Sequence, residues 1–118
     1  MIESFRDLTV WQKAMELAVS VYGVTEKLPR SEMYGLTAQI RRAVVSIPSN
    51  IAEGKAMGGG SYSHHIKIAI GSEAELQTQI ELARRLHMVG EEEARRVIAQ
   101  TSEVGRMMAS LFKSLLNH

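Results

Sequence analysis

Apolar residues recur at steps of three and four along most of the chain, and this period constrains the fold more than any other feature. Such spacing places side chains on one face of an α-helix. No segment shows the period of two that a half-buried strand requires, so we expect no sheet. The pattern falls into four segments, which predict helices over residues 9–28, 32–54, 61–88 and 91–116.

The connections between these segments are short, which favours antiparallel neighbours. A chain of 118 residues forms one domain of ordinary size, here residues 1–118. We therefore predict an all-α fold, an antiparallel up-down-up-down four-helix bundle. The one glycine-rich connection, KAMGGGS at residues 55–61, is expected to be mobile, and it lacks the spacing of a phosphate-binding P-loop.

The first segment carries two neighbouring apolar lines. Thr9 and Gln12 have the spacing of a capping box, and Pro29 is expected to end the helix. One line follows steps of three and four, and the second lies beside it: Val10, Ala14, Leu17, Val21, Val24 and Leu28, then Trp11, Met15, Ala18 and Tyr22. A stripe of this width predicts burial against more than one neighbour, and we expect another subunit to cover part of it.

The second segment combines an apolar face, a proline and a polar line. Ser31 is its expected N-cap and Gly54 its expected end. Pro48 removes one backbone donor, so the helix should bend or loosen there unless packing compensates. The apolar face comprises Leu36, Ile40, Val44, Ile47 and Ile51, and the polar line beside it comprises Gln39, Ser46, Asn50 and Glu53.

Polar residues also interrupt the third segment, beside a core face centred on Ala69, Leu76 and Ala83. In an antiparallel hairpin, Gln39 and Arg42 come near Glu75, and we predict that Glu75 is buried and paired with Arg42. By the same register, Asn50 and Glu53 lie level with His64 and His65. The polar residues fix helix register, form a subunit contact or line a ligand pocket: Gln39, Arg42, Ser46, Asn50, Glu53, Ser72, Glu75 and Gln79.

Three stretches together resemble a known family. FRDLTVWQKAMELAVSVY, QIRRAVVSIPSNIAEG and GSEAELQTQIELARRL are similar to the small bacterial four helix bundle proteins, some of which are encoded in intervening sequences of 23S ribosomal RNA genes. The accessory variability-determinant proteins of diversity-generating retroelements look like relatives. The resemblance runs from about Phe5 to Leu86, and it implies a ring-shaped homopentamer of four-helix bundles. For most members of the family the biochemical function is unknown.

Charge bears on whether the chain binds nucleic acid. Lys and Arg number 14 and Asp and Glu number 13, and both signs are spread evenly along the chain. Strong phosphate binders usually cluster positive charge. Three adjacent arginine pairs are the candidate RNA or DNA contacts, which an oligomer could gather into one ring: Arg41 with Arg42, Arg84 with Arg85, and Arg95 with Arg96.

The sequence supplies little that points to catalysis. His64 and His65 are consecutive and point in different directions on a helix, and the Glu-x-x-His pairs of di-iron bundles are absent. We therefore expect no catalytic residues, metal or cofactor. The absence of cysteine, of a signal-peptide pattern and of a long apolar run indicates a cytoplasmic protein without a membrane partner.

Two functions follow from these observations. The favoured one is a non-enzymatic, homo-oligomeric interaction or scaffold protein, supported by the wide apolar stripe and by the family resemblance. The alternative is an RNA- or DNA-binding accessory protein linked to rRNA intervening sequences or to a retroelement. The retroelement accessory proteins are strongly basic, whereas this chain has a formal net charge of +1.

Overall fold

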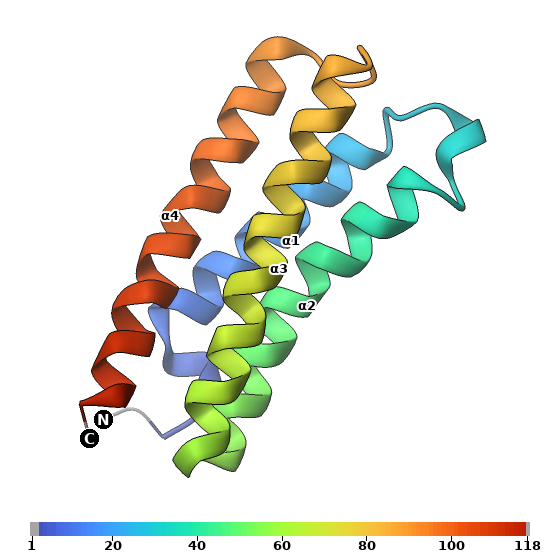
Figure 1. The fold of residues 1–118 in the computed structure, drawn as a ribbon. Helices are drawn as coiled ribbons and strands as arrows, with labels where there is room; N and C mark the ends of the chain where they lie inside the picture. The colour runs from blue at the N-terminus through green and yellow to red at the C-terminus, as the bar shows by residue number, and fades with distance from the viewer. Residues whose placement is uncertain (1–2, 118) are drawn as a thin grey trace.

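In the computed structural model, which describes residues 3–117, the chain forms four long helices. They are α1 (Thr9–Thr25), α2 (Leu36–Met57), α3 (Gly59–Arg85) and α4 (Glu91–Leu116), with short 3-10 helices η1 (Phe5–Asp7) before α1 and η2 (Arg30–Glu32) before α2. The described residues contain no strand, and each long helix runs antiparallel to the next (Figure 1). The predicted all-α four-helix bundle is confirmed.

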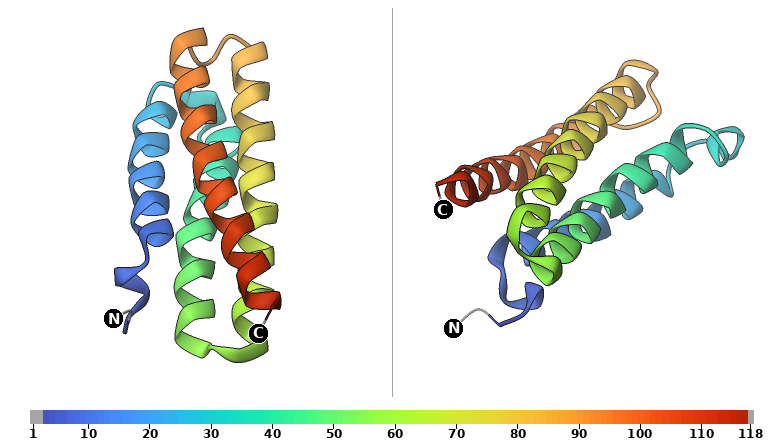
Figure 2. Two further views of the ribbon diagram at one scale, coloured as in Figure 1. Left: turned by 90° about the vertical axis from the view of Figure 1, so that its left-hand side faces the viewer. Right: turned by 60° about the horizontal axis from the view of Figure 1, so that its bottom comes forward.

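The helices form a ring of neighbours in chain order. α1 contacts α2 and α4, and α3 contacts α2 and α4, with the most extensive packing between α2 and α3. Within residues 3–117, α1 and α3 share no contact and so lie across the bundle from each other. The α1–α2 and α3–α4 hairpins come close at the α2–α3 connection and diverge toward the other end of the molecule (Figure 2).

The core contains the apolar lines that the sequence predicts. The first line of α1 is buried from Val10 to Leu28, and the apolar face of α2 is buried from Leu36 to Ile51. By contrast, the second line of α1 is divided. Trp11 and Ala18 pack against the core, whereas Met15 is 41% exposed and Tyr22 39% exposed. Burial of the correctly placed residues supplies most of the stability of such a bundle.

The predicted capping box at the start of α1 is wrong, because the observed capping box belongs to the short helix η1 that precedes α1. The capping box is formed by Ser4 and Asp7 around η1, where the Ser4 hydroxyl accepts from the Arg6 amide at 3.1 Å. The α1 N-cap, Leu8, has no side-chain bond. The Gln12 side chain instead donates to the carbonyl of Arg6 at 2.9 Å, which ties α1 to the preceding turn.

The connection between α1 and α2 is longer than predicted. α1 ends at Thr25 rather than at residue 28, and the Thr25 hydroxyl donates to the carbonyl of Tyr22. Ser31 lies within η2 and does not cap α2, which begins at Leu36. Glu32 satisfies that first turn, since its carboxylate accepts from the Leu36 amide at 3.2 Å.

The glycine-rich segment is mostly helical and forms a very short connection, rather than the loop that we expected. α2 continues past Gly54 to Met57, and α3 begins at Gly59, so that only Gly58 separates the two helices. Gly58 and Gly59 have φ values of 70° and 55°, a region that glycine adopts without a steric cost. Gly54 is instead a contact residue between helices, as described below.

The remaining helix ends are close to prediction. α3 spans Gly59–Arg85 rather than residues 61–88, and α4 spans residues 91–116 as predicted. His87 turns the chain with φ 60°, the one positive φ at a non-glycine position among the described residues. No described helix has the length and apolar character needed to cross a membrane.

Candidate functional site

A chain of hydrogen bonds joins α2 to α3 near their connection. The hydroxyls of Ser46 and Ser72 lie 2.8 Å apart, and the Asn50 amide donates to the Ser46 carbonyl at 2.8 Å and to its hydroxyl at 3.0 Å. The Asn50 carbonyl oxygen lies 2.9 Å from Nδ1 of His65. Because that oxygen can only accept, the Nδ1 position must carry the proton. This polar network contains residues that the sequence predicted to lie side by side.

Glu53 extends the network toward solvent. Its carboxylate lies 3.7 Å from Nδ1 of His65, whose side chain is only 16% exposed, whereas that of Glu53 is 61% exposed. The predicted level of Asn50 and Glu53 with His65 is therefore confirmed. His64, the adjacent residue, is exposed and takes no part, as its different direction on the helix requires.

Gly54 explains why the two helices approach so closely here. A Cβ at this position would lie 3.0 Å from the Cβ of His65 and 3.1 Å from the carbonyl oxygen of Tyr62. Both distances are shorter than ordinary carbon contacts, so a larger residue would push α3 away from α2. The missing side chain is thus a condition for the Asn50–His65 hydrogen bond.

Farther along α2 and α3, the helices enclose an open groove of about 410 Å³, hereafter the α2–α3 groove. It is lined by Gln39, Arg42, Ala43, Ser46, Ser72 and Glu75. Gln39 and Arg42 do approach Glu75 as predicted, but Glu75 is exposed, and no ion pair joins it to Arg42. The prediction of a buried Glu75–Arg42 pair is wrong within the protomer, because Glu75 lies on the exposed edge of α3.

Gln79 continues the polar line of α3 beyond this groove. Its side chain is buried, with 8% exposed, and its carbonyl oxygen has no hydrogen-bond partner in the described part of the chain. Buried polar atoms without partners are rare and destabilising. The polar line therefore has two parts, one fully bonded near Asn50 and one incompletely bonded near Gln79.

Three of the six arginines proposed as nucleic-acid contacts, Arg84, Arg85 and Arg95, form ion pairs with carboxylates. Arg84 pairs with Glu81 at 2.6 Å and with Glu91 at 2.9 Å, and Arg85 also pairs with Glu81. The hydrogen bonds from Arg84 and then Arg85 lower the pKa of Glu81 to about 2. The same contacts raise the pKa of Arg84 above its usual range. This corner ties α3 to α4 rather than presenting free positive charge.

The other arginines differ among themselves. Arg95 pairs with Glu92 at 2.6 Å on the surface of α4. Arg41 donates to the Thr25 hydroxyl at 2.9 Å, and its guanidinium lies 4.7 Å from the ring centre of Tyr22. Arg42 and Arg96 form no ion pair within residues 3–117. The six arginines therefore do not form one basic patch on the protomer.

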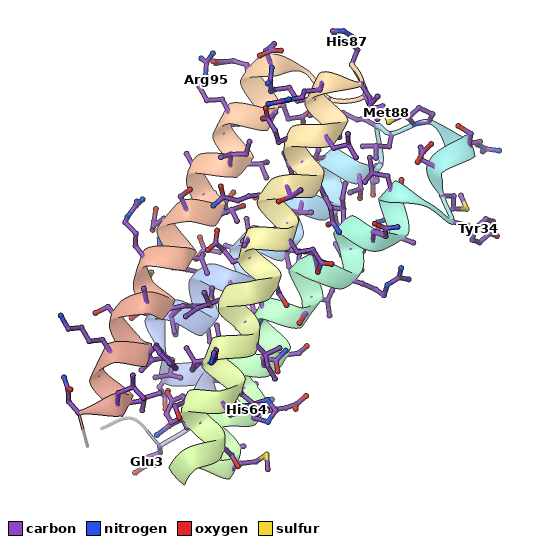
Figure 3. The ribbon with its side chains drawn as sticks, in the orientation of Figure 1. Glu3, Tyr34, His64, His87, Met88 and Arg95 are labelled. Atoms are coloured by element: carbon purple, nitrogen blue, oxygen red, sulfur yellow. The ribbon has the colours of Figure 1, made fainter. Side chains whose placement is uncertain are left out.

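An apolar surface lies on the outside of α1. It comprises Met15, Ala18, Val19, Tyr22, Gly23 and Glu26 and is hereafter the α1 surface. Val19 is 74% exposed, the highest fraction of any apolar residue within a described helix. Figure 3 shows the described side chains as sticks. Tyr34, which is labelled there, lies in the α1–α2 connection and points outward from it. The sequence predicted this stripe through Met15 and Tyr22 but not through Val19.

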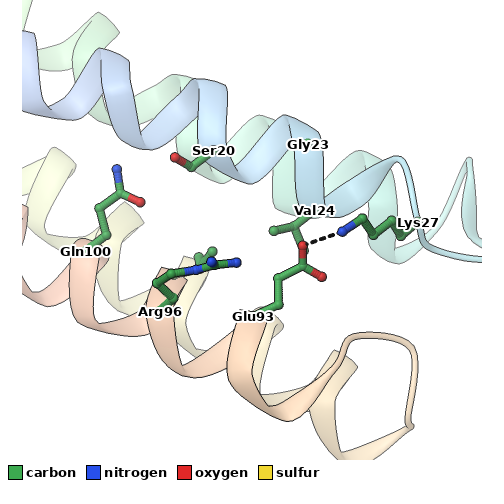
Figure 4. A pocket seen from close by; sticks show the side chains of 8 residues that line it. Ser20, Gly23, Val24, Lys27, Glu93, Arg96 and Gln100 are labelled. Atoms are coloured by element: carbon green, nitrogen blue, oxygen red, sulfur yellow. Dashed lines mark hydrogen bonds and ion pairs between the residues drawn. The ribbon is translucent and has the colours of Figure 1, made fainter.

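A second open groove, of about 500 Å³, separates α1 from α4. Lys27, two residues after α1, and Glu93 of α4 form an ion pair of 2.7 Å across it, and Arg96 lies between Glu93 and Gln100 (Figure 4). Gly23 contributes no side chain to its wall. Val24 and Val97 also line the groove.

The arrangement of the described side chains gives little indication of catalysis or metal binding. Within residues 3–117, no three His, Asp or Glu side chains come together as a metal site requires. The network histidine, His65, has Asn50 as its nearest partner, and no nucleophile is hydrogen-bonded to it. The described geometry is that of helix contacts and exposed surfaces.

Comparison with known proteins identifies related sequences. Residues 6–110 match the family model of the 23S rRNA-intervening sequence proteins, so the family resemblance is confirmed. The fold is also similar to the crystal structure of a protein of unknown function from the S23 ribosomal protein family of Bacteroides thetaiotaomicron, with a TM-score of 0.82 and 23% sequence identity. That similarity covers 88% of this chain and 95% of the other. No curated protein matches the chain.

Proposed function

The chain belongs to the 23S rRNA-intervening sequence protein family, and we propose that it is a non-enzymatic interaction protein of the cytoplasm that assembles with further copies of itself. The observation that carries this proposal is the α1 surface, where Met15, Val19 and Tyr22 expose apolar area side by side. Contiguous apolar patches on soluble proteins mark interaction sites.

The organisation of the α1 surface supports a protein contact. The guanidinium of Arg41 stacks on Tyr22 and is held in turn by Thr25, so the tyrosine ring is fixed before a partner arrives. Rigid aromatic side chains surrounded by apolar residues are typical energetic centres of interfaces. We propose a ring of five copies, a number that rests on the family resemblance alone.

A charge placed within the α1 surface tests this proposal. Val19→Asp should reduce the mass measured by light scattering to that of the 13.1 kDa chain, because an aspartate would lose its hydration in the interface. Val19 is too exposed for the substitution to unfold the protomer, and circular dichroism checks this. Ser110→Asp, at an exposed position on α4, is the matched control and should keep the wild-type mass. Equal masses for Val19→Asp and wild type would overturn the proposal.

RNA or DNA binding is the second candidate, and the rRNA named in the family's description favours it. Arg42 and Arg96 are the arginines best placed for phosphates, since neither forms an ion pair within residues 3–117. Binding to structured RNA and to duplex DNA, followed by fluorescence anisotropy, should then weaken steeply between about 50 and 200 mM salt. Removal of Arg42 and Arg96 together should reduce that slope, and absence of binding at low salt would exclude this function.

A further inference from the structure

We propose that the α1 surface of one protomer docks into the α2–α3 groove of the next, so that copies join head to tail. This inference rests on the proposed self-assembly and adds the identity of the two surfaces. Both are open in the protomer, and α3, which forms one wall of the groove, lies across the bundle from α1. A contact between two different surfaces is heterologous, and repetition closes a ring or builds a filament.

The α2–α3 groove has an apolar rim to match the α1 surface. Ile68 is 40% exposed and Leu82 47%, and these residues lie seven positions before and after Glu75 on the same edge of α3. The groove has a volume of about 410 Å³, and the α1 surface is a more open hollow of about 390 Å³ along the outside of α1. An amphipathic helix lying in a groove with apolar anchors is a common mode of protein recognition.

Charge complementarity selects these two surfaces as partners. Glu26 lies on the α1 surface and Arg42 lines the groove, and neither has an ion-pair partner within residues 3–117. An ion pair between Glu26 of one protomer and Arg42 of the next would give each of these groups an opposite charge across the contact.

Complementation between two variants tests the head-to-tail contact. Val19→Asp damages the α1 surface and leaves the groove intact, whereas Leu82→Asp damages the groove rim and leaves the α1 surface intact. Each variant alone should be monomeric by light scattering. Their equimolar mixture should form a dimer, since one good surface remains on each partner, and the dimer should not grow further. A mixture that stays monomeric while the wild type is oligomeric would overturn this inference and leave the proposed function standing.

A charge exchange tests the same contact independently. Arg42→Glu should weaken assembly, seen as a shift of the dissociation midpoint to at least tenfold higher protein concentration. Addition of Glu26→Arg in the same chain should restore much of it, because opposite charges again face each other between subunits. Failure of the second change to restore assembly would contradict the assigned pairing. A monomeric wild type would instead contradict the proposed function itself.

Discussion

At the scale of single residues, the α2–α3 interface is built from one absent side chain and a few polar ones. Gly54 permits the close approach, Asn50 bonds to both helices, and Ser46 with Ser72 completes the link. Hydrogen bonds between polar side chains fix how two helices are aligned, because any other alignment leaves buried groups unbonded. The alternative of a register-fixing network is therefore the one that the bonded half of the polar line supports.

Gly54 provides the first test at this scale. Gly54→Ala should lower the free energy of unfolding by about 1–3 kcal/mol, since the added methyl group meets His65 and the Tyr62 backbone. Gly71→Ala is the control, because an added Cβ there meets nothing within 4 Å. It should raise stability by up to about 1 kcal/mol through helix propensity. Chemical denaturation at one protein concentration measures both, and equal effects would show that Gly54 is not a contact position.

Gln79 provides a second test, because its buried side-chain carbonyl oxygen has no hydrogen-bond partner among residues 3–117. Gln79→Leu removes this unbonded atom and should leave the free energy of unfolding unchanged or raise it by about 1 kcal/mol. Gln77→Leu is the control on the same helix, since Gln77 bonds to Glu73 and to Ser102 of α4. That variant should lose about 1 kcal/mol. A larger loss for Gln79→Leu than for Gln77→Leu would reveal a bonded role for Gln79.

At the scale of the elements, the α3–α4 corner is held by Glu81 together with Arg84 and Arg85. Because the folded-state pKa of Glu81 is lowered to about 2 from 4.5, its contribution to stability is present above about pH 4.5 and is lost as the pH falls through about 2. The side-chain carboxyl signal of Glu81 in an NMR titration should therefore move only near pH 2. Arg84→Met should raise that pKa toward its ordinary value, and an unchanged pKa in this variant would contradict the assignment.

The elements also show what local sequence can and cannot predict. The recurrence of apolar residues at steps of three and four predicted all four helices, because this spacing places them on one face that can be buried. Helix ends were less predictable, since they depend on short helices without an apolar period. Ser4 caps the short helix η1, and Glu32, which lies in the short helix η2, accepts from the first amide of α2. Glycine is typical of helix ends, yet Gly54 lies inside α2. It is needed there because α2 packs closely against His65.

The candidate site was predictable to the extent that it depends on register. Antiparallel alignment correctly brought Asn50 level with His65, which are adjacent to the connection where alignment is tightly constrained. The same alignment correctly placed Arg42 and Glu75 in one groove, but it did not predict that Glu75 is exposed. Exposure of a residue beside a helix contact depends on the packing of the whole bundle, which the pattern along one helix does not show.

At the scale of the whole molecule, the exposed features of the bundle lie on different sides. The α1 surface adjoins the α1–α4 groove at Gly23, whereas the α2–α3 groove shares no residue with either. The charged corner of α3 and α4 is internally neutralised. A protomer with two dissimilar, unoccupied surfaces is suited to repeated assembly rather than to a single pairwise contact. This arrangement favours the interaction protein over the nucleic-acid binder.

The central claim is that the wild-type chain assembles with itself, and sedimentation equilibrium at micromolar concentrations tests it most directly. The account predicts a mass that is a multiple of the 13.1 kDa chain, with a pentamer as the expected species. Dilution should reveal dissociation without a loss of helicity, because each protomer has its own core. A mass of 13.1 kDa at every concentration would contradict the account.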